Sequence, residues 1–276
     1  MSNQPVKSEA PKSDKPSIEA MKAVAKLTSD ILRMFQERTM HGVELGQLDQ
    51  HAAQMLKEAG AESYNKGYQP EWAKIPYPAI ACYSINEQVC HAPPGDRILK
   101  AGDIVSYDIG IKLNGACGDA AFTVGVGGIE NRLARLMRYT RRALDAGILR
   151  CRVGNTVEQV SRAIEDVAMI NGFRVIKEFG GHFIGSEMHM KPHIANYLMP
   201  DWKRTDEEKE SYGHVFQEGD ILCVEPMFTT GRGQIGVMGD DKWTIFCLDD
   251  QPCAQFEDMV LITKDGPAIL TDHIQR

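Results

Sequence analysis

Apolar residues recur at helical spacing in four stretches of the chain. The spacing is close to 3.6 residues over positions 18–39, 44–59, 130–149 and 156–170. Each stretch has an apolar face and a polar face, so we expect four helices that pack against a core.

Local signals mark the ends of these helices. Thr156 and Gln159 have the spacing of a capping box, which satisfies free backbone N–H groups at a helix start. Gly60 and Gly172 follow the second and fourth apolar stretches, where a residue in the left-handed conformation commonly ends a helix. We therefore expect the helices to begin or end at these residues.

Short apolar runs between the helices predict strands. The runs cover residues 80–85, 103–113, 116–126, 173–178, 220–229, 243–248 and 254–263. The order is two helices followed by strands, and this order then repeats. Segregated helices and strands indicate an α+β fold with antiparallel sheet. We expect two related α/β halves, residues 17–127 and 128–276, packed as one body with the boundary near Gly127-Gly128.

Composition narrows the class of protein. The polar residues 1–16 are expected to be a disordered tail, and no later run approaches the roughly 20 apolar residues of a membrane span. The net charge of -7 argues against nucleic acid or anionic membranes as partners. Seven cysteines without a Cys-x-x-Cys pair argue against a disulfide framework or a thiolate zinc finger, and most are expected to be buried. We expect an intracellular, cytoplasmic protein.

The dipeptide Asn114-Gly115 predicts a two-residue hairpin between two of the strands. In that register Asp119 lies opposite Gly110, and Asp108 lies opposite Ala121. Both carboxylates then share one face of the sheet as diagonal neighbours, with Cα atoms roughly 7–8 Å apart.

Two carboxylates on one face of an apolar strand pair repel each other. A hard divalent cation would compensate them, because carboxylate oxygens are its preferred ligands. The alternative is that one aspartate is a turn residue or faces solvent. This alternative is stronger for Asp119, which follows Gly118, than for Asp108, which lies inside an apolar strand.

Three further residues join this candidate site. His182 stands among glycines, which permit close approach of the backbone. Glu225 and Glu257 each interrupt an apolar run, where a carboxylate is costly unless it is paired or metal-bound. Either glutamate could instead face water at a strand edge. Four carboxylates and an imidazole suit two cations roughly 3.5–4 Å apart, the arrangement of many hydrolytic sites.

The motifs around these residues resemble those of the methionine aminopeptidases, of type I more than type II. They are the stretch from Ser84 to His91, the Asp108 and Asp119 pair, Gly181-His182 with His189, Val224 to Met227, and Ala254 to Glu257. The resemblance extends from about Ile18 to the end of the chain. It implies a pita-bread fold over residues 17–276, a single catalytic domain of two pseudo-symmetric α/β halves with a curved, mainly antiparallel sheet covered by helices.

The resemblance also implies the roles of particular residues. It assigns two divalent ions (Co, Mn, Fe or Zn) to five ligands: Asp108, Asp119, His182, Glu225 and Glu257. It assigns catalysis to His91, His189 and Glu225. It assigns substrate binding to His91 and His189 together with Tyr77, Cys82, Met188 and Trp243.

This sequence departs from the family pattern beside the ligands. The unusual residues are Ala120, Phe183, Met190 and Lys191, and residues 92–94 also differ. The segment 196–213 is longer than usual and could cover the mouth of the site or bind a partner. Phe183 could narrow the site. The ligands are unchanged, so the departures bear on pocket shape, substrate preference and rate.

The implied function is removal of the N-terminal methionine from nascent proteins and peptides. The implied partners are peptide and nascent-protein N-termini, with the ribosome as a further candidate, and the family suggests a monomer. A prolidase or aminopeptidase P relative would share the ligands and the fold, but such enzymes usually carry an additional N-terminal domain. A catalytically weak pita-bread protein that binds RNA or protein is a third reading, disfavoured by the complete ligand set and the acidic charge.

Overall fold

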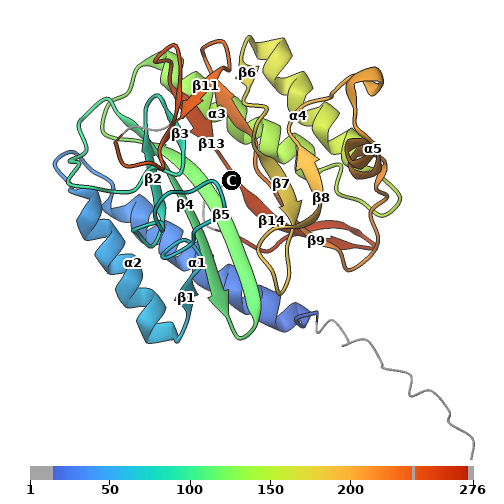
Figure 1. The fold of residues 1–276 in the computed structure, drawn as a ribbon, viewed down its shortest axis with the longest axis horizontal. Helices are drawn as coiled ribbons and strands as arrows, with labels where there is room; N and C mark the ends of the chain where they lie inside the picture. The colour runs from blue at the N-terminus through green and yellow to red at the C-terminus, as the bar shows by residue number, and fades with distance from the viewer. Residues whose placement is uncertain (1–14, 238–239, 273–276) are drawn as a thin grey trace, which may run out of the picture.

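The fold was analysed in a computed structural model that describes residues 15–237 and 240–272. The first half begins with two helices and continues into strands (Figure 1). The predicted tail falls almost wholly on residues 1–14, which lie outside the described residues. The elements of this half are α1 (Ile18–Arg38), α2 (Leu45–Ala59), β1 (Glu62–Ser63), β2 (Cys82–Ile85), β3 (Gln88–Cys90), β4 (Ile104–Leu113) and β5 (Ala116–Gly125).

Helix α1 covers one face of the hairpin formed by β4 and β5. Its buried stripe includes Met21, Val24, Ile31 and Phe35, and the Phe35 ring stacks on Tyr107 of β4 at 4.9 Å between centroids. Burying an apolar side chain of this size stabilises the fold by roughly 1.5–3 kcal/mol. The helix therefore holds the hairpin rigidly from behind and leaves its other face available for a site.

The hairpin has the predicted register. Asp108 pairs with Ala121 and Asp119 pairs with Gly110, while Asn114 and Gly115 form the turn with positive φ angles of 51° and 77°. Both residues thus adopt the left-handed conformation that a type I′ turn requires. The predicted placement of the two aspartates on one face is confirmed.

The second half repeats the order of helices followed by strands. Five of its strands form an antiparallel sheet in the order β15-β14-β9-β7-β8. The helices are α3 (Asn131–Ile148), α4 (Val157–Asn171) and α5 (Asp206–Gly213), with a short 3-10 helix η1 (Asp201–Lys203). The strands are β6 (Arg174–Val175), β7 (Gly180–Phe183), β8 (Met190–Ala195), β9 (Ile221–Val224), β10 (Met227–Thr229), β11 (Ile235–Val237), β12 (Ile245–Cys247), β13 (Cys253–Gln255), β14 (Asp258–Thr263) and β15 (Gly266–Ile269).

The predicted helix ends are confirmed. Thr156 and Gln159 form a capping box at the start of α4. Gly60 and Gly172 end α2 and α4 in the left-handed conformation. Local sequence alone therefore determined where these helices begin and end.

Two predicted strands are each interrupted, and a third, predicted at residues 173–178, is reduced to β6. Residues 220–229 form β9 and β10 with a break at Glu225 and Pro226, and residues 254–263 form part of β13 and all of β14 with a break at Phe256 and Glu257. Proline has no N–H to donate to a sheet ladder, which explains the first break. Both breaks occur at candidate metal ligands.

Several elements were not predicted, among them the short strands β1, β3, β11 and β15, the helix η1, and the longer elements β7, β8 and α5. Strand β7 is rich in glycine, and β8 contains Pro192, so neither has the composition of a strand. Helix α5 lies within the long segment 196–213 and buries Tyr212 as its one fully packed residue, so it has no apolar stripe. A capping box between Thr205 and Glu208 starts this helix instead.

The two halves meet along β5. An isolated antiparallel bridge joins Ala121 of β5 to Glu257, and the Thr123 hydroxyl donates to the Gln255 carbonyl at 2.8 Å. Helices α1 and α2 lie beside β4 and β5 in Figure 1, whereas α3 and α4 lie behind the strands of the second half. All strand pairings among the described residues are antiparallel.

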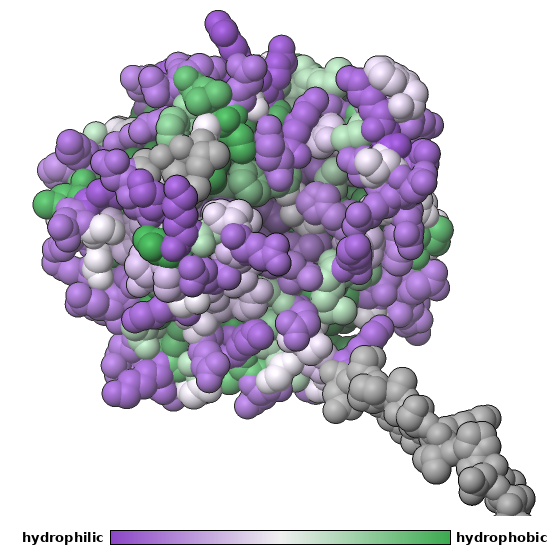
Figure 2. Space-filling view, in the orientation of Figure 1, coloured by the Kyte–Doolittle hydropathy of each residue, from purple (hydrophilic) through white to green (hydrophobic). Residues whose placement is uncertain are grey.

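The exterior is mainly polar. Hydrophilic residues cover most of the face seen in Figure 2, with apolar residues scattered among them. Within the described ranges, no helix combines the length and the apolar character needed to cross a bilayer.

Candidate metal centre and active site

A cavity of about 320 Å³ lies where the two halves meet. The five predicted metal ligands all line it, although they come from five different segments of the chain. They are Asp108 on β4, Asp119 on β5, His182 on β7, Glu225 after β9 and Glu257 before β14. The alternative that any of them faces bulk solvent is therefore excluded.

The two aspartates form one wall of the cavity. Asp119 is only 7% exposed, and Asp108 accepts a hydrogen bond at 3.4 Å from the Gln255 side-chain amide. Gln255 belongs to β13 of the second half, so the aspartate is held by a side chain from across the seam. This contact fixes the orientation of one carboxylate before any ion binds.

The two glutamates lie in short breaks between consecutive strands. Glu225 lies between β9 and β10, and Glu257 lies between β13 and β14. The Glu257 N–H donates to the Ala121 carbonyl at 2.8 Å, and Ala121 is the cross-strand partner of Asp108. This hydrogen bond anchors the backbone of Glu257 beside the hairpin that carries Asp108. A break in the ladder frees each glutamate from the strict alternation of a strand, and both side chains reach the cavity.

His182 depends on a close approach between β7 and β9. A Cβ atom at the preceding Gly181 would lie 2.1 Å from the carbonyl oxygen of Cys223, so glycine is required there. The His182 Nδ1 lies 3.2 Å from the carbonyl oxygen of Phe183 and must donate to it, because a carbonyl only accepts. In the neutral ring this leaves the Nε2 lone pair facing the cavity.

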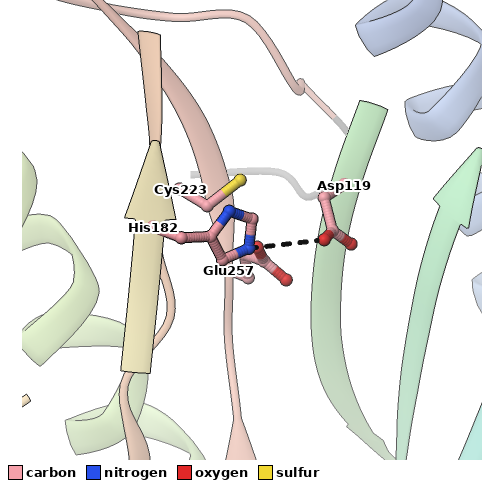
Figure 3. Close-up of side chains that lie close together, drawn as sticks. All are labelled: Asp119, His182, Cys223 and Glu257. Carbon is pink, nitrogen blue, oxygen red and sulfur yellow. Dashed lines mark ion pairs between the residues drawn. The ribbon is translucent and has the colours of Figure 1, made fainter. Parts of the chain in front are cut away.

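That nitrogen faces carboxylates. His182 Nε2 is 3.6 Å from Asp119 Oδ2 (Figure 3). The same nitrogen is 4.0 Å from Glu225 Oε1. A lone pair and carboxylate oxygens repel one another unless a proton or a cation lies between them. The orientation of this ring is the one expected of an imidazole metal ligand.

The electrostatics of the cavity favour a cation. Burial, and then the neighbouring acidic groups, raise the pKa of Asp108, Glu225 and Glu257 well above the usual range of a carboxyl. Glu257 is 2% exposed, and its Oε1 has no hydrogen-bond partner. Acceptor groups that are buried, clustered and unpaired are stabilised by divalent ions, so the donor set fits a metal centre.

Two histidines stand near the carboxylates. The His189 ring lies 4.6 Å from the His182 ring, and burial is the main cause that lowers its pKa. His91 adopts a positive φ of 57°, and its ring contacts Phe179 at 5.4 Å. Burial, and then His189, lower the pKa of His91 to about 4. Both predicted catalytic histidines therefore line the cavity as neutral rings at pH 7.

An apolar pocket opens from the same cavity. Tyr77, Cys82 and Trp243 pack together in it, with the Tyr77 and Trp243 rings edge to face at 5.0 Å. Met188 is buried against Gly110 of β4. These four residues, together with His91 and His189, complete the six that were predicted to bind substrate, and all six line the cavity.

Several lining residues were not predicted from the sequence. They are Tyr64, Asn65, Tyr68, Trp72, Phe179, His193 and Met227. His193 pairs with His182 across β7 and β8, so recognising β8 would have revealed it. The segment that carries Tyr64 to Trp72 contains almost no regular structure and gives no periodic signal.

Cys223 was not predicted as a site residue either. Its Sγ atom belongs to a group with one ligand atom each from Asp119, His182 and Glu257, and these atoms all lie within 4.8 Å of one another (Figure 3). All seven cysteines are free and buried, as expected for most of them. The signal for this one was its position two residues before Glu225 in the same apolar run.

The departures from the family pattern lie outside the cavity. Phe183 packs against His214 and Phe216 on the opposite face from His182, so the expectation that it could narrow the site is wrong. Ala120 is buried in the core, and Lys191 extends outward to Glu207 at 2.7 Å. The segment 196–213 contributes no residue to the cavity wall, so it does not cover the site directly.

Comparisons with known proteins agree with this geometry. A sequence profile for metallopeptidase family M24 matches residues 19–264. The methionine aminopeptidase of Clostridium perfringens is 34% identical over 254 residues, which cover 92% of this chain and 95% of that protein. The methionine aminopeptidase 1 of Mycobacterium tuberculosis is 35% identical, with 92% of each chain covered.

Solved structures share the fold. The crystal structure of methionine aminopeptidase from Thermotoga maritima aligns with a TM-score of 0.83 and 33% identity, covering 92% of this chain and 96% of that one. The prolidase from Pyrococcus furiosus aligns with a TM-score of 0.69 and 16% identity, and only 64% of it is covered. The prediction of an α+β, pita-bread fold is confirmed. On its sequence, its fold and its ligand geometry, the chain belongs to metallopeptidase family M24.

Proposed function

We propose that this chain is a metal-dependent aminopeptidase that removes the N-terminal methionine from nascent proteins and peptides by hydrolysis. The observation that carries the proposal is one cavity that combines four carboxylates and an imidazole with a buried apolar pocket. Similarity to methionine aminopeptidases over about nine tenths of the chain supports the same substrate class.

We propose that the centre holds two divalent ions, of Co, Mn, Fe or Zn. The ligands would be Asp108, Asp119, His182, Glu225 and Glu257. Carboxylates can bridge a pair of ions, which suits a set of four. When bound, such a pair lowers the pKa of water and polarises a scissile carbonyl, which is the chemistry that peptide hydrolysis needs.

His91 and His189 bind and orient the peptide in this proposal. A neutral imidazole can donate from one nitrogen and accept at the other, and the pKa of about 4 keeps His91 neutral at pH 7. The His189 ring lies 4.6 Å from the ring of His182, a proposed metal ligand. Hydrogen bonds from the two rings would stabilise the oxygen that gains negative charge in the transition state.

Glu225 moves the proton. Its carboxylate would take the proton from the attacking water and deliver it to the nitrogen of the leaving peptide. Glu225 lines the cavity beside the candidate ligands, so its carboxylate is within reach of a water bound there. A positioned carboxylate of this kind acts as a general acid–base group.

The pocket suits the methionine side chain. The Tyr77 hydroxyl donates to the Ala81 carbonyl at 3.1 Å, and the Trp243 indole N–H donates to the Ile75 carbonyl at 3.1 Å. Their polar atoms are thus already paired, and aromatic rings remain to contact the substrate. A thioether gains roughly 0.3–1.5 kcal/mol from contact with an aromatic ring.

The deciding experiment is a peptide panel assayed across metals. Purified protein with Mn(II), Co(II), Fe(II) or Zn(II) should release methionine from Met-Ala-Ser and should leave an Ala-Pro peptide intact. Absence of methionine release with every metal would refute the proposal. Cleavage of the Ala-Pro peptide alone would indicate a prolidase-like enzyme instead.

Metal analysis distinguishes the proposed enzyme from a catalytically weak protein of the same fold. A catalytically weak binding protein would retain less than one equivalent of tightly bound divalent ion after gel filtration, whereas the proposed enzyme retains about two. We also propose a cytoplasmic location, with nascent chains at the ribosome as substrates. We further propose a monomeric state, and sedimentation of the purified protein would test the oligomeric state.

A further inference from the structure

The group of donors around the centre contains a sulfur atom. Cys223 is fully buried at the end of β9, and its Sγ lies within 4.8 Å of ligand atoms from Asp119, His182 and Glu257. Figure 3 shows the thiol beside the His182 ring, with the two carboxylates across from it. The thiol therefore lies beside three candidate metal ligands, although Cys223 is not among the residues that line the cavity.

The backbone holds Cys223 in that place. Its neighbour Leu222 pairs with Phe183 of β7, and Cys223 itself pairs with Met259 of β14. The missing side chain of Gly181 lets β7 approach the Cys223 carbonyl closely. The thiol is thus fixed between the strand that carries His182 and the strand that follows Glu257.

A second observation indicates a ligand at this point. Glu257 is 2% exposed, and its Oε1 atom has no hydrogen-bond partner. The Cys223 thiol is hydrogen-bonded to this carboxylate, but the Oε1 atom remains without a partner. A buried acceptor of this kind is stabilised by a cation or a further donor. The donors of a tetrahedral ion with bonds of 2.0–2.3 Å are separated by roughly 3.3–3.8 Å, so modest side-chain movement would complete the site.

We propose that Cys223 contributes a sulfur donor to the ion held by Asp119, His182 and Glu257. Sulfur is a soft ligand and favours Zn(II), Fe(II) and Co(II) over Mn(II), which prefers oxygen. Cys223 thereby shifts the metal preference of an otherwise oxygen-rich centre. The inference rests on the metal centre of the proposed function but not on its substrate.

Cobalt spectroscopy tests the sulfur directly. Metal-free protein is titrated with Co(II) and followed in the near ultraviolet, where a cobalt–sulfur bond gives a charge-transfer band. We expect the band in the wild type, its loss in Cys223→Ser and Cys223→Thr, and its retention in Cys90→Ser. Cys90 is a matched control, because it is equally buried but packs in a separate apolar cluster with Val89 and Ile176.

Metal competition gives a second readout. The ratio of Zn(II) to Mn(II) affinity, measured by calorimetry, should fall roughly tenfold or more in Cys223→Thr, the scale on which neighbours of metal ligands act. Two variants are used so that misfolding of one, checked by circular dichroism, leaves the other informative.

The outcomes separate this inference from the proposed function. If Co(II) binds to the wild type without a charge-transfer band, or if the band persists in both Cys223 variants, the sulfur donor is refuted and the peptidase proposal stands. If the wild type binds no Co(II), both proposals fall.

Discussion

Ala121 and Glu257 are joined across the two halves by a pair of backbone hydrogen bonds. The Glu257 N–H donates to the Ala121 carbonyl at 2.8 Å, and the Ala121 N–H donates to the Glu257 carbonyl at 3.4 Å. Ala121 is also the cross-strand partner of Asp108. One alanine therefore aligns a carboxylate from each half, and the seam between the halves builds the centre.

Adding metal should stabilise the protein. An ion that binds the assembled carboxylates but not the unfolded chain stabilises the fold by about 2.7 kcal/mol at a hundred times its Kd. We expect the melting temperature of metal-free protein to rise with Mn(II) or Co(II) and to return to its starting value with a chelator. A melting temperature that is independent of metal would contradict the assignment of the centre.

Glu257→Gln should show how much the negative charge of Glu257 contributes to metal binding, because the substitution leaves its backbone bridge in place. The amide keeps the bridge to Ala121 but removes one negative charge from the cluster, so the metal-free protein should remain folded. Its metal affinity, measured by calorimetry, should fall by more than the 10–100-fold that loss of an outer neighbour costs.

Glu62→Gln provides the matched control for this change. Glu62 lies exposed on β1 and takes no part in the cavity. Its metal affinity should equal that of the wild type. Equal losses in both variants would mean that net charge, and not the position of Glu257, controls binding.

Gly181→Ala should damage the centre without replacing any proposed ligand. The new Cβ would collide with the Cys223 carbonyl oxygen at 2.1 Å, so β7 must move away from β9 and carry His182 with it. Overpacking of this kind costs about 1–3 kcal/mol, and we expect a matching loss in urea denaturation together with weaker metal binding. Gly213→Ala is the control, because nothing lies within 4 Å of its Cβ.

His91 should make the metal-free protein sensitive to acid. Its pKa is about 4 when folded and 6.5 ordinarily, so between these values the unfolded chain binds more protons. The contribution of His91 to the free energy of unfolding therefore falls as the pH drops through this window, by up to about 2 kcal/mol between pH 7 and pH 5. The raised pKa values of Asp108, Glu225 and Glu257 act in the opposite direction over the same window, so the contribution of His91 is measured against a variant.

His91→Asn should remove this sensitivity. Asparagine tolerates the positive φ at this position, so the backbone is preserved. The change in the free energy of unfolding from pH 7 to pH 5, measured by urea denaturation, should be more favourable to the folded state in His91→Asn than in the wild type by up to about 2 kcal/mol. The exposed His51→Asn should behave like the wild type, and an unchanged pH dependence in His91→Asn would refute the argument.

The sequence by itself determined the local structure. Helical periodicity, the capping box at Thr156 and the glycine at position 172 defined the helices, since these signals act over a few residues. The turn at Asn114-Gly115 fixed the register of Asp108 and Asp119, because a strand alternates its faces strictly. The motifs also identified the family.

Only the tertiary structure decided how distant segments meet. Three features depend on contacts across more than 30 residues: the bridge between Ala121 and Glu257, the approach of the Cys223 thiol to His182, and the packing of Phe183 against His214. Periodicity shows which way a side chain points within its own element. It carries no information on which element lies opposite, because that is set by the packing of the whole core.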